Sequence, residues 1–429
     1  MAKRLFLWLI SLSLLSAARP IAVRAAANAG GQEKTPEARF AAAFELPRLP
    51  ALGGRPADWR QWDSFFTFIV KRLGQDMGGD LRSSLAETFL DSRYELTQTV
   101  SRLGAGRNPV PQLFLNAWKR LSPIMNKAVA GLPKQSAGQY ASFIGAADKM
   151  AALGQSGSQF GLLEISPDAL RTMARLLQPS GGGDPISYSL NVDGALRNLL
   201  GFGAPIDVRS PGGRQSGLRV FPWNVEQAFV GSAHAADADI KKLNQWVPEE
   251  NELQSYLVEV RNLLAALSDK VGVQAKLAEE HKPLYRQIVL AAAWQESCWR
   301  QYIKKGKNLI PLASASGDLG LMQVNRNTWR NLYDLKRLGG NIEYNGNAGG
   351  EILAYYLSRY AIRKNEDKQA GGNLSRATYA AYNGGPSHLT RYRAAKQNAE
   401  LKKVDDAFWE KFQTVSSGRE LEVKRCYQK

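Results

Sequence analysis

Residues 283–299 have the sequence PLYRQIVLAAAWQESCW, and this stretch decides the fold of the C-terminal third of the chain. Proline suits the first turn of a helix, and the residues that follow it favour helix. On a 3.6-residue repeat Val289, Ala292, Ala293 and Glu296 share one face, so a carboxylate ends an apolar stripe. Burial and a helix C-terminus both disfavour negative charge, which would raise the pKa of Glu296 toward that of a general acid. A surface glutamate at a frayed helix end is the alternative that this stretch leaves open.

Two later segments favour the first interpretation. Residues 314–329, SASGDLGLMQVNRNTW, contain glycines that let the backbone approach a ligand or another segment closely. In residues 378–392, TYAAYNGGPSHLTRY, Tyr379 and Tyr382 lie about one helical turn apart, and Asn-Gly-Gly is a typical helix end. Each segment alone is a weak signal, because such turns and helix ends are common.

Together and in this order, three motifs resemble the soluble lytic transglycosylase domain. They are Glu296-Ser297, then Ser-x-x-Gly-x-x-Gly-Leu-Met-Gln at residues 314–323, then Ala-Tyr-Asn-Gly-Gly at residues 381–385. Residues 345–360, NGNAGGEILAYYLSRY, are similar to the family's helix between the second and third motifs, where Gly349 would allow close helix packing. The resemblance implies a goose-lysozyme-like, mostly helical catalytic domain. Because the apolar periodicity of the preceding region is also largely helical, we expect a mainly α protein.

The resemblance also implies roles for individual residues. Glu296 matches the single catalytic acid, and Ser314 matches the serine that hydrogen-bonds the catalytic carboxyl. Gln323 and Tyr382 match residues that line the glycan groove, and Asn383 matches the asparagine of the same motif. The implied activity is lytic cleavage of peptidoglycan between N-acetylmuramic acid and N-acetylglucosamine, with 1,6-anhydromuramoyl products, in cell-wall remodelling or turnover.

The sequence departs from the family pattern in three places. About nine extra residues, within QYIKKGKNLIPLA, separate Glu296 from Ser314, and Asn325-Arg326 replaces the usual Met-Pro. Asp318 stands where the family usually has alanine. A second carboxylate there would suit a goose-type hydrolase, which is one alternative function, although a solvent-facing turn aspartate is the simpler interpretation of Asp318. A non-catalytic wall-binding or secretion-assembly protein is the other alternative.

The N-terminal part divides into a leader and a long region of unassigned role. A basic start and an apolar run over residues 5–18, followed by small residues, predict a secretory signal peptide within residues 1–29. Residues 30–280 are predicted to be mostly helical, with Ser166 as an N-cap, a short helix within residues 191–202 and a longer one over residues 250–270. The catalytic domain is assigned to residues 281–400 and a C-terminal tail to residues 401–429.

Charge and cysteine content bear on partners and location. Residues 281–429 contain 25 Lys and Arg against 13 Asp and Glu, a net charge of +12, whereas residues 1–280 carry +5. Such a charge favours anionic partners, and export makes nucleic acid an unsuitable one, so we expect binding to peptidoglycan glycan strands in the periplasm or cell envelope. The N-terminal region leaves room for envelope-assembly partners. Cys298 and Cys426 are predicted to form a disulfide, and we expect no metal or other cofactor.

Overall fold

The computed structural model describes residues 57–102, 108–156, 164–179, 181–206 and 240–428. The predicted signal peptide within residues 1–29 lies outside these residues. All described residues belong to one unit that spans residues 52–429, so the N-terminal helices and the C-terminal helices are packed together. Among the described helices, none is long and apolar enough to cross a membrane.

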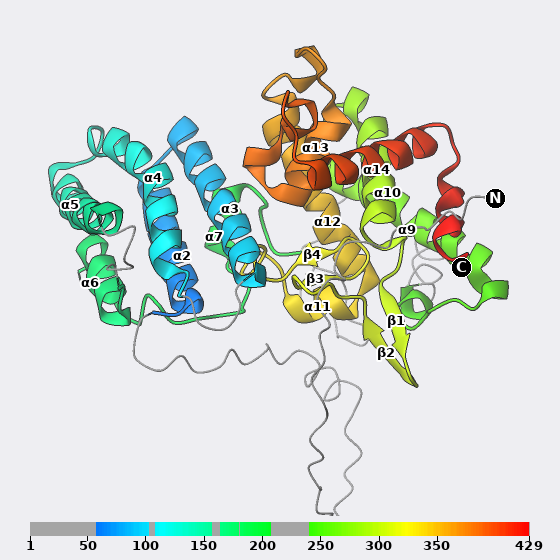
Figure 1. The fold of residues 1–429 in the computed structure, drawn as a ribbon, viewed down its shortest axis with the longest axis horizontal. Coiled ribbons are helices and arrows are strands. Elements are labelled where there is room, and N and C mark those ends of the chain that lie inside the picture. Colours follow the sequence, from blue (N-terminus) through cyan, green and yellow to red (C-terminus); the bar gives the residue numbers. More distant parts are fainter. Residues whose placement is uncertain (1–56, 103–107, 157–163, 180, 207–239, 429) are drawn as a thin grey trace, which may run out of the picture. The chain divides into compact units, whose positions relative to one another are not determined.

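Helix α10 (Lys282–Ser297) is the central element of the C-terminal part, and it forms where residues 283–299 predict a helix. Pro283 lies in its first turn, and Val289, Ala292 and Ala293 are buried. The helix ends because Cys298 turns into the left-handed region, with a φ of 53°. Four helices pack against α10, as Figure 1 shows: α9 (Leu253–Gln274), α12 (Ile342–Tyr356), α13 (Leu374–Gly384) and α14 (Ala399–Ser416).

The short elements connect these helices. They are the helices η1 (Glu250–Glu252), η2 (Glu279–His281), α11 (Leu335–Gly340), η3 (Leu357–Ile362, a π-helix), η4 (Glu366–Lys368), η5 (Pro386–His388), η6 (Arg391–Arg393) and η7 (Glu420–Cys426). Residues 401–429, predicted as a tail, contribute most of α14 and all of η7.

Two small antiparallel sheets follow α10. Strands β1 (Tyr302–Lys305) and β2 (Asn308–Pro311) form a hairpin that projects from the helices in Figure 1. This hairpin accommodates the extra residues between Glu296 and Ser314. Strands β3 (Asp318–Leu319) and β4 (Val324–Asn325) pair within the glycine-rich motif, with Asp318 opposite Asn325.

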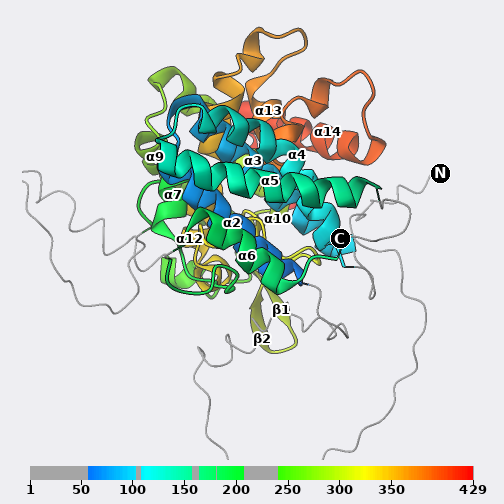
Figure 2. The same ribbon diagram turned by 90° about the vertical axis from the view of Figure 1, so that its left-hand side faces the viewer.

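Helices α2 to α7 form the N-terminal part of the described chain. They are α2 (Trp59–Asp76), α3 (Gly79–Arg102), α4 (Val110–Val129), α5 (Lys134–Ser156), α6 (Pro167–Leu177) and α7 (Gly194–Leu200), and Figure 2 shows α5 and α6 facing the viewer. Ser166 caps α6 by accepting a hydrogen bond from the backbone N–H of Ala169 at 3.2 Å, as predicted. Helix α7 is the short helix expected within residues 191–202. The prediction of a mainly α fold is confirmed.

Candidate active site

Glu296 lies in the last turn of α10, with its side chain partly exposed. Its Oε1 accepts a hydrogen bond of 2.9 Å from the Tyr379 hydroxyl of α13. Burial raises the pKa of Glu296 to about 8, while the Tyr379 hydrogen bond opposes the rise and the charge of Asp318 adds to it. A carboxyl with this pKa is largely protonated at neutral pH, so it can donate a proton to a leaving group.

Tyr379 is the residue of the site that the motifs left unassigned. Its ring is buried and stacks on the fully buried ring of Phe408 in α14, with centroids 4.0 Å apart and an angle of 3° between the planes. This stacking fixes the hydroxyl that reaches Glu296. The spacing of Tyr379 and Tyr382 put both on one face of α13, but nothing in the sequence placed that face against the end of α10.

The glycine-rich motif is held against α10 and α12 by buried side chains. Ser297, next to the acid, donates its hydroxyl to the carbonyl of Leu321 at 2.6 Å. The amide side chain of Asn345 accepts from the backbone N–H of Met322 and donates to the carbonyl of Leu319, each at 2.7 Å. Gly349 packs closely against the motif rather than against another helix, because a Cβ there would lie 2.4 Å from the Met322 side chain. The motif is thus fixed beside Glu296.

Ser314 differs from its expected role. Its hydroxyl donates to Asp318 Oδ2 at 2.5 Å rather than to Glu296. The physical reason is the aspartate itself, which stands in place of the usual alanine and offers a carboxylate within the same turn. Asp318 also accepts from the Ser316 hydroxyl at 2.5 Å and from Asn325 Nδ2 at 2.8 Å. Protein donors therefore occupy most of its acceptor positions.

The other three predicted site residues, Gln323, Tyr382 and Asn383, bond to the protein backbone or to a neighbouring side chain. Gln323, with a φ of 47°, donates from Nε2 to the carbonyl of Gly320 at 2.7 Å. The hydroxyl of the buried Tyr382 donates to the carbonyl of Met322 at 2.5 Å, which ties α13 to the glycine-rich motif. Asn383 is exposed. These contacts show how each residue is positioned, and their roles in glycan binding stay predictions.

Arg391 adds a positive charge near the acid that the motifs did not indicate. It donates to Asn383 Oδ1 at 2.9 Å and pairs with the buried Asp405 of α14 at 2.7 Å. Its charge lowers the pKa of Glu296, opposing the larger effect of burial. Arg391 lies within the segment quoted for the third motif, yet only the folded chain brings it toward Glu296.

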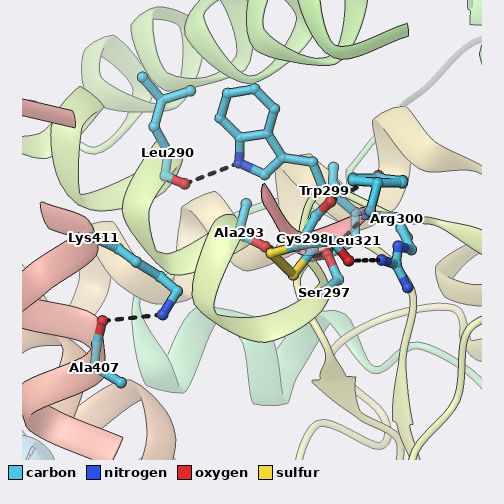
Figure 3. The surroundings of a disulfide bond; sticks show 11 residues. Leu290, Ala293, Ser297, Cys298, Trp299, Arg300, Leu321, Ala407 and Lys411 are labelled. Carbon is cyan, nitrogen blue, oxygen red and sulfur yellow. Dashed lines mark hydrogen bonds between the residues drawn. A yellow bond between two sulfur atoms is a disulfide. The ribbon is translucent and has the colours of Figure 1, made fainter. Parts of the chain in front are cut away.

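A disulfide fixes the segment that follows the acid, as the sequence predicts. It joins Cys298 and Cys426, whose Cα atoms are 6.1 Å apart. Figure 3 shows the disulfide beside Trp299, whose Nε1–H donates to the carbonyl of Leu290 at 3.1 Å. The Tyr427 hydroxyl donates to the carbonyl of Cys298 at 2.8 Å. The chain after Glu296 is thereby anchored to both α10 and the C-terminal residues.

Comparison with known protein families matches residues 275–404 to the family described as Transglycosylase SLT domain. The match covers less than a third of the chain and includes all three motifs. Searches of curated proteins and of solved structures gave no match. The family acts on peptidoglycan, and its helical, lysozyme-like fold agrees with the architecture described above. Residues 275–404, in the C-terminal third of the chain, therefore form a transglycosylase SLT domain.

Proposed function

We propose that this protein is a peptidoglycan lytic transglycosylase in which Glu296 is the catalytic acid and base. The observation that carries the proposal is the position of Glu296 at a partly exposed helix end within an SLT domain, where its Oε1 accepts a hydrogen bond of 2.9 Å from Tyr379 and burial raises its pKa to about 8. Burial supplies most of the rise, and the Tyr379 hydroxyl holds the carboxyl in one orientation. A group in this state can give up a proton and later take one back near neutral pH.

The reaction needs only one carboxyl if the substrate supplies the nucleophile. Glu296 would protonate the oxygen between N-acetylmuramic acid and N-acetylglucosamine, and the substrate's acetamido group would stabilise the positive charge that develops. The resulting Glu296 carboxylate would accept the proton of the muramoyl 6-hydroxyl as that oxygen bonds to carbon 1. The product is a 1,6-anhydro sugar, no water is consumed, and the proximity of the 6-hydroxyl favours it over water.

Asp318 is the residue that a hydrolytic alternative would use as a base. Its oxygens are occupied by Ser314, Ser316 and Asn325, and its charge raises the pKa of Glu296. These contacts favour an electrostatic role, in which Asp318 keeps the acid protonated, over activation of a water molecule.

Mass analysis of the products from purified peptidoglycan tests the proposed function. We expect 1,6-anhydromuramic ends from the wild-type chain. Glu296→Gln keeps the shape but loses the proton, so we expect activity to fall by at least about two to four orders of magnitude. New reducing ends would show that water is the nucleophile. Activity of Glu296→Gln close to that of the wild type would contradict the assignment of the acid.

We also propose that the protein acts outside the cytoplasm, in the periplasm or cell envelope. The proposal rests on the basic residues that begin the sequence, on the apolar run over residues 5–18 that follows them, and on the location of peptidoglycan outside the cytoplasm. The test is to express the full chain, fractionate the cells and sequence the N-terminus of the mature protein. We expect the protein in the envelope fraction, without its signal peptide.

A further inference from the structure

Helix α3 lies outside the SLT domain, yet Tyr94 in this helix contacts the third motif directly. The Tyr94 hydroxyl donates to the carbonyl of Tyr382 at 2.8 Å, and both side chains are buried. Gly385, with a φ of 96°, packs so closely that a Cβ there would lie 2.9 Å from the Tyr94 ring. Burial chiefly raises the pKa of Tyr94, and the charges of Asp318 and Glu296 raise it further.

Arg93, the preceding residue, holds the loop that follows β4. Its Nη1 donates to the carbonyls of Asn327 and Arg330, both at 3.1 Å, and of Thr328 at 3.4 Å. The guanidinium is fully buried and pairs with Asp63 of α2 at 2.6 Å. Because a buried guanidinium must keep its acceptors, these carbonyls are held in one arrangement.

Thr97, one turn further along α3, extends these contacts to the second motif. Its hydroxyl lies 2.9 Å from that of Thr328 and donates to Asn325 Oδ1 at 3.4 Å. Asn325 in turn donates to Asp318, the carboxylate that raises the pKa of Glu296. A continuous set of hydrogen bonds therefore runs from α3 to a neighbour of the acid.

We propose that helix α3 is part of the active site, with Tyr94 as the positioning residue for Tyr382 and Thr97 as the positioning residue for Asn325 and Asp318. The inference rests on the proposed function, and it gives the N-terminal region a direct part in the reaction. Helix α3 bonds to residues 325–330, to the carbonyl of Tyr382 and, through Asp91 Oδ1, to the backbone N–H of Ser387 at 3.0 Å, so the SLT domain alone lacks these supports. Displacements of about 1 Å at an active site cost up to roughly a hundredfold in rate.

The test compares two Tyr→Phe variants of the full chain that each lose one tyrosine hydroxyl. Tyr94→Phe removes the bond to Tyr382, whereas the control Tyr140→Phe removes a 2.8 Å bond to Asp76, between α5 and α2. Both rings are buried, with 1% of Tyr140 and 9% of Tyr94 exposed. We expect Tyr94→Phe to lower kcat on peptidoglycan roughly tenfold with KM nearly unchanged, and Tyr140→Phe to leave both unchanged.

Thr97→Val is the second test variant beside Tyr94→Phe. It keeps the volume of the side chain and loses the hydrogen bonds to Thr328 and Asn325. We expect it to lower kcat and to shift the alkaline limb of the pH–rate profile, because Asp318 would move relative to Glu296. Wild-type kcat and pH profile in both folded variants would overturn the inference. An equal loss of kcat in Tyr140→Phe would overturn it as well, since it would mark a general loss of stability.

Hydrogen exchange gives a measure that does not depend on activity. We expect faster exchange in residues 322–331 and 382–388 of Tyr94→Phe and Thr97→Val, and wild-type exchange there in Tyr140→Phe. Unchanged exchange in all three variants would overturn the positioning role. A wild-type chain that fails to cleave peptidoglycan would instead contradict the proposed function. The exchange data would still decide whether α3 holds residues 322–331 and 382–388 in place.

Discussion

At the scale of single residues, two neighbours act on the pKa of Glu296 in opposite directions. The charge of Asp318 raises it, and the hydrogen bond from Tyr379 lowers it because the bond stabilises the carboxylate. In the proposed reaction Glu296 must be protonated to act, so kcat/KM should fall as pH rises through about 8. This fall is the alkaline limb of the pH–rate profile. Asp318→Asn should move the limb to lower pH, and Tyr379→Phe should move it to higher pH, each by roughly one unit.

Both shifts are measured as kcat/KM on peptidoglycan across the pH range in which each variant stays folded. Asp406→Asn is a suitable control for the loss of a charge, because Asp406 is an exposed residue of α14 that pairs with Lys402 and Arg376 on the surface. It should leave the limb in place. A limb that keeps its position in Asp318→Asn and Tyr379→Phe would mean that a group other than Glu296 titrates there.

At the scale of elements, the Cys298–Cys426 disulfide joins the end of α10 to η7. It closes a loop of 128 residues, for which chain entropy predicts a stabilisation of about 4–5 kcal/mol. We expect reduction to lower Tm and also to lower activity, since the bridge anchors the residues directly after Glu296. Calorimetry with and without reductant measures the first effect, and a peptidoglycan assay the second.

A double variant separates the disulfide from other actions of the reductant. Cys298→Ala with Cys426→Ala should reproduce the lower Tm in the absence of reductant. The hydrogen bond from Tyr427 to the carbonyl of residue 298 and the packing of Phe408 remain in this variant, so it should still fold. Equal Tm values for the oxidised, reduced and double-alanine proteins would show that the bridge contributes nothing to stability.

At the scale of the whole molecule, Asp63 joins the N-terminal helices to the SLT domain. It is 2% exposed and pairs with Arg93 of α3 and with Arg330 of the SLT domain, each at 2.6 Å. Asp63→Ala leaves two buried cations without their partner, so we expect the free energy of unfolding to fall by about 3–5 kcal/mol. Denaturant unfolding followed by tryptophan fluorescence measures the change.

Asp80→Ala provides the control for this prediction. Asp80 also links α3 to the SLT-domain side, through Arg363 at 2.8 Å, but its side chain is 90% exposed. Exposed pairs contribute about 0–1 kcal/mol, so this variant should unfold almost as the wild type does. If the two variants are equally stable, the buried cluster does not hold the N-terminal helices to the SLT domain.

The sequence by itself determined the features that depend on residues adjacent in the chain. The run of residues 283–299 predicted α10 and placed Glu296 at its end, and Ser166 marked the start of α6. Asn-Gly-Gly marked the end of α13, where Gly385 has the positive φ that favours glycine. Periodicity, capping and left-handed helix ends act within a few residues, so they can be recognised without knowing the rest of the fold. The three motifs are also short stretches of adjacent residues, so they indicated the family before the fold was known.

Only the tertiary structure decided which groups meet around Glu296. The Tyr379 hydroxyl comes from 83 residues further along the chain, and the Tyr94 contact with Tyr382 spans 288 residues. Ser314 bonds to Asp318 instead of the acid, which the motif alone did not predict. Hydrogen-bond partners and desolvation are set by every element packed around a group, whereas a sequence pattern reports one element at a time. The pKa of Glu296, and with it the proposed chemistry, is therefore a property of the whole fold.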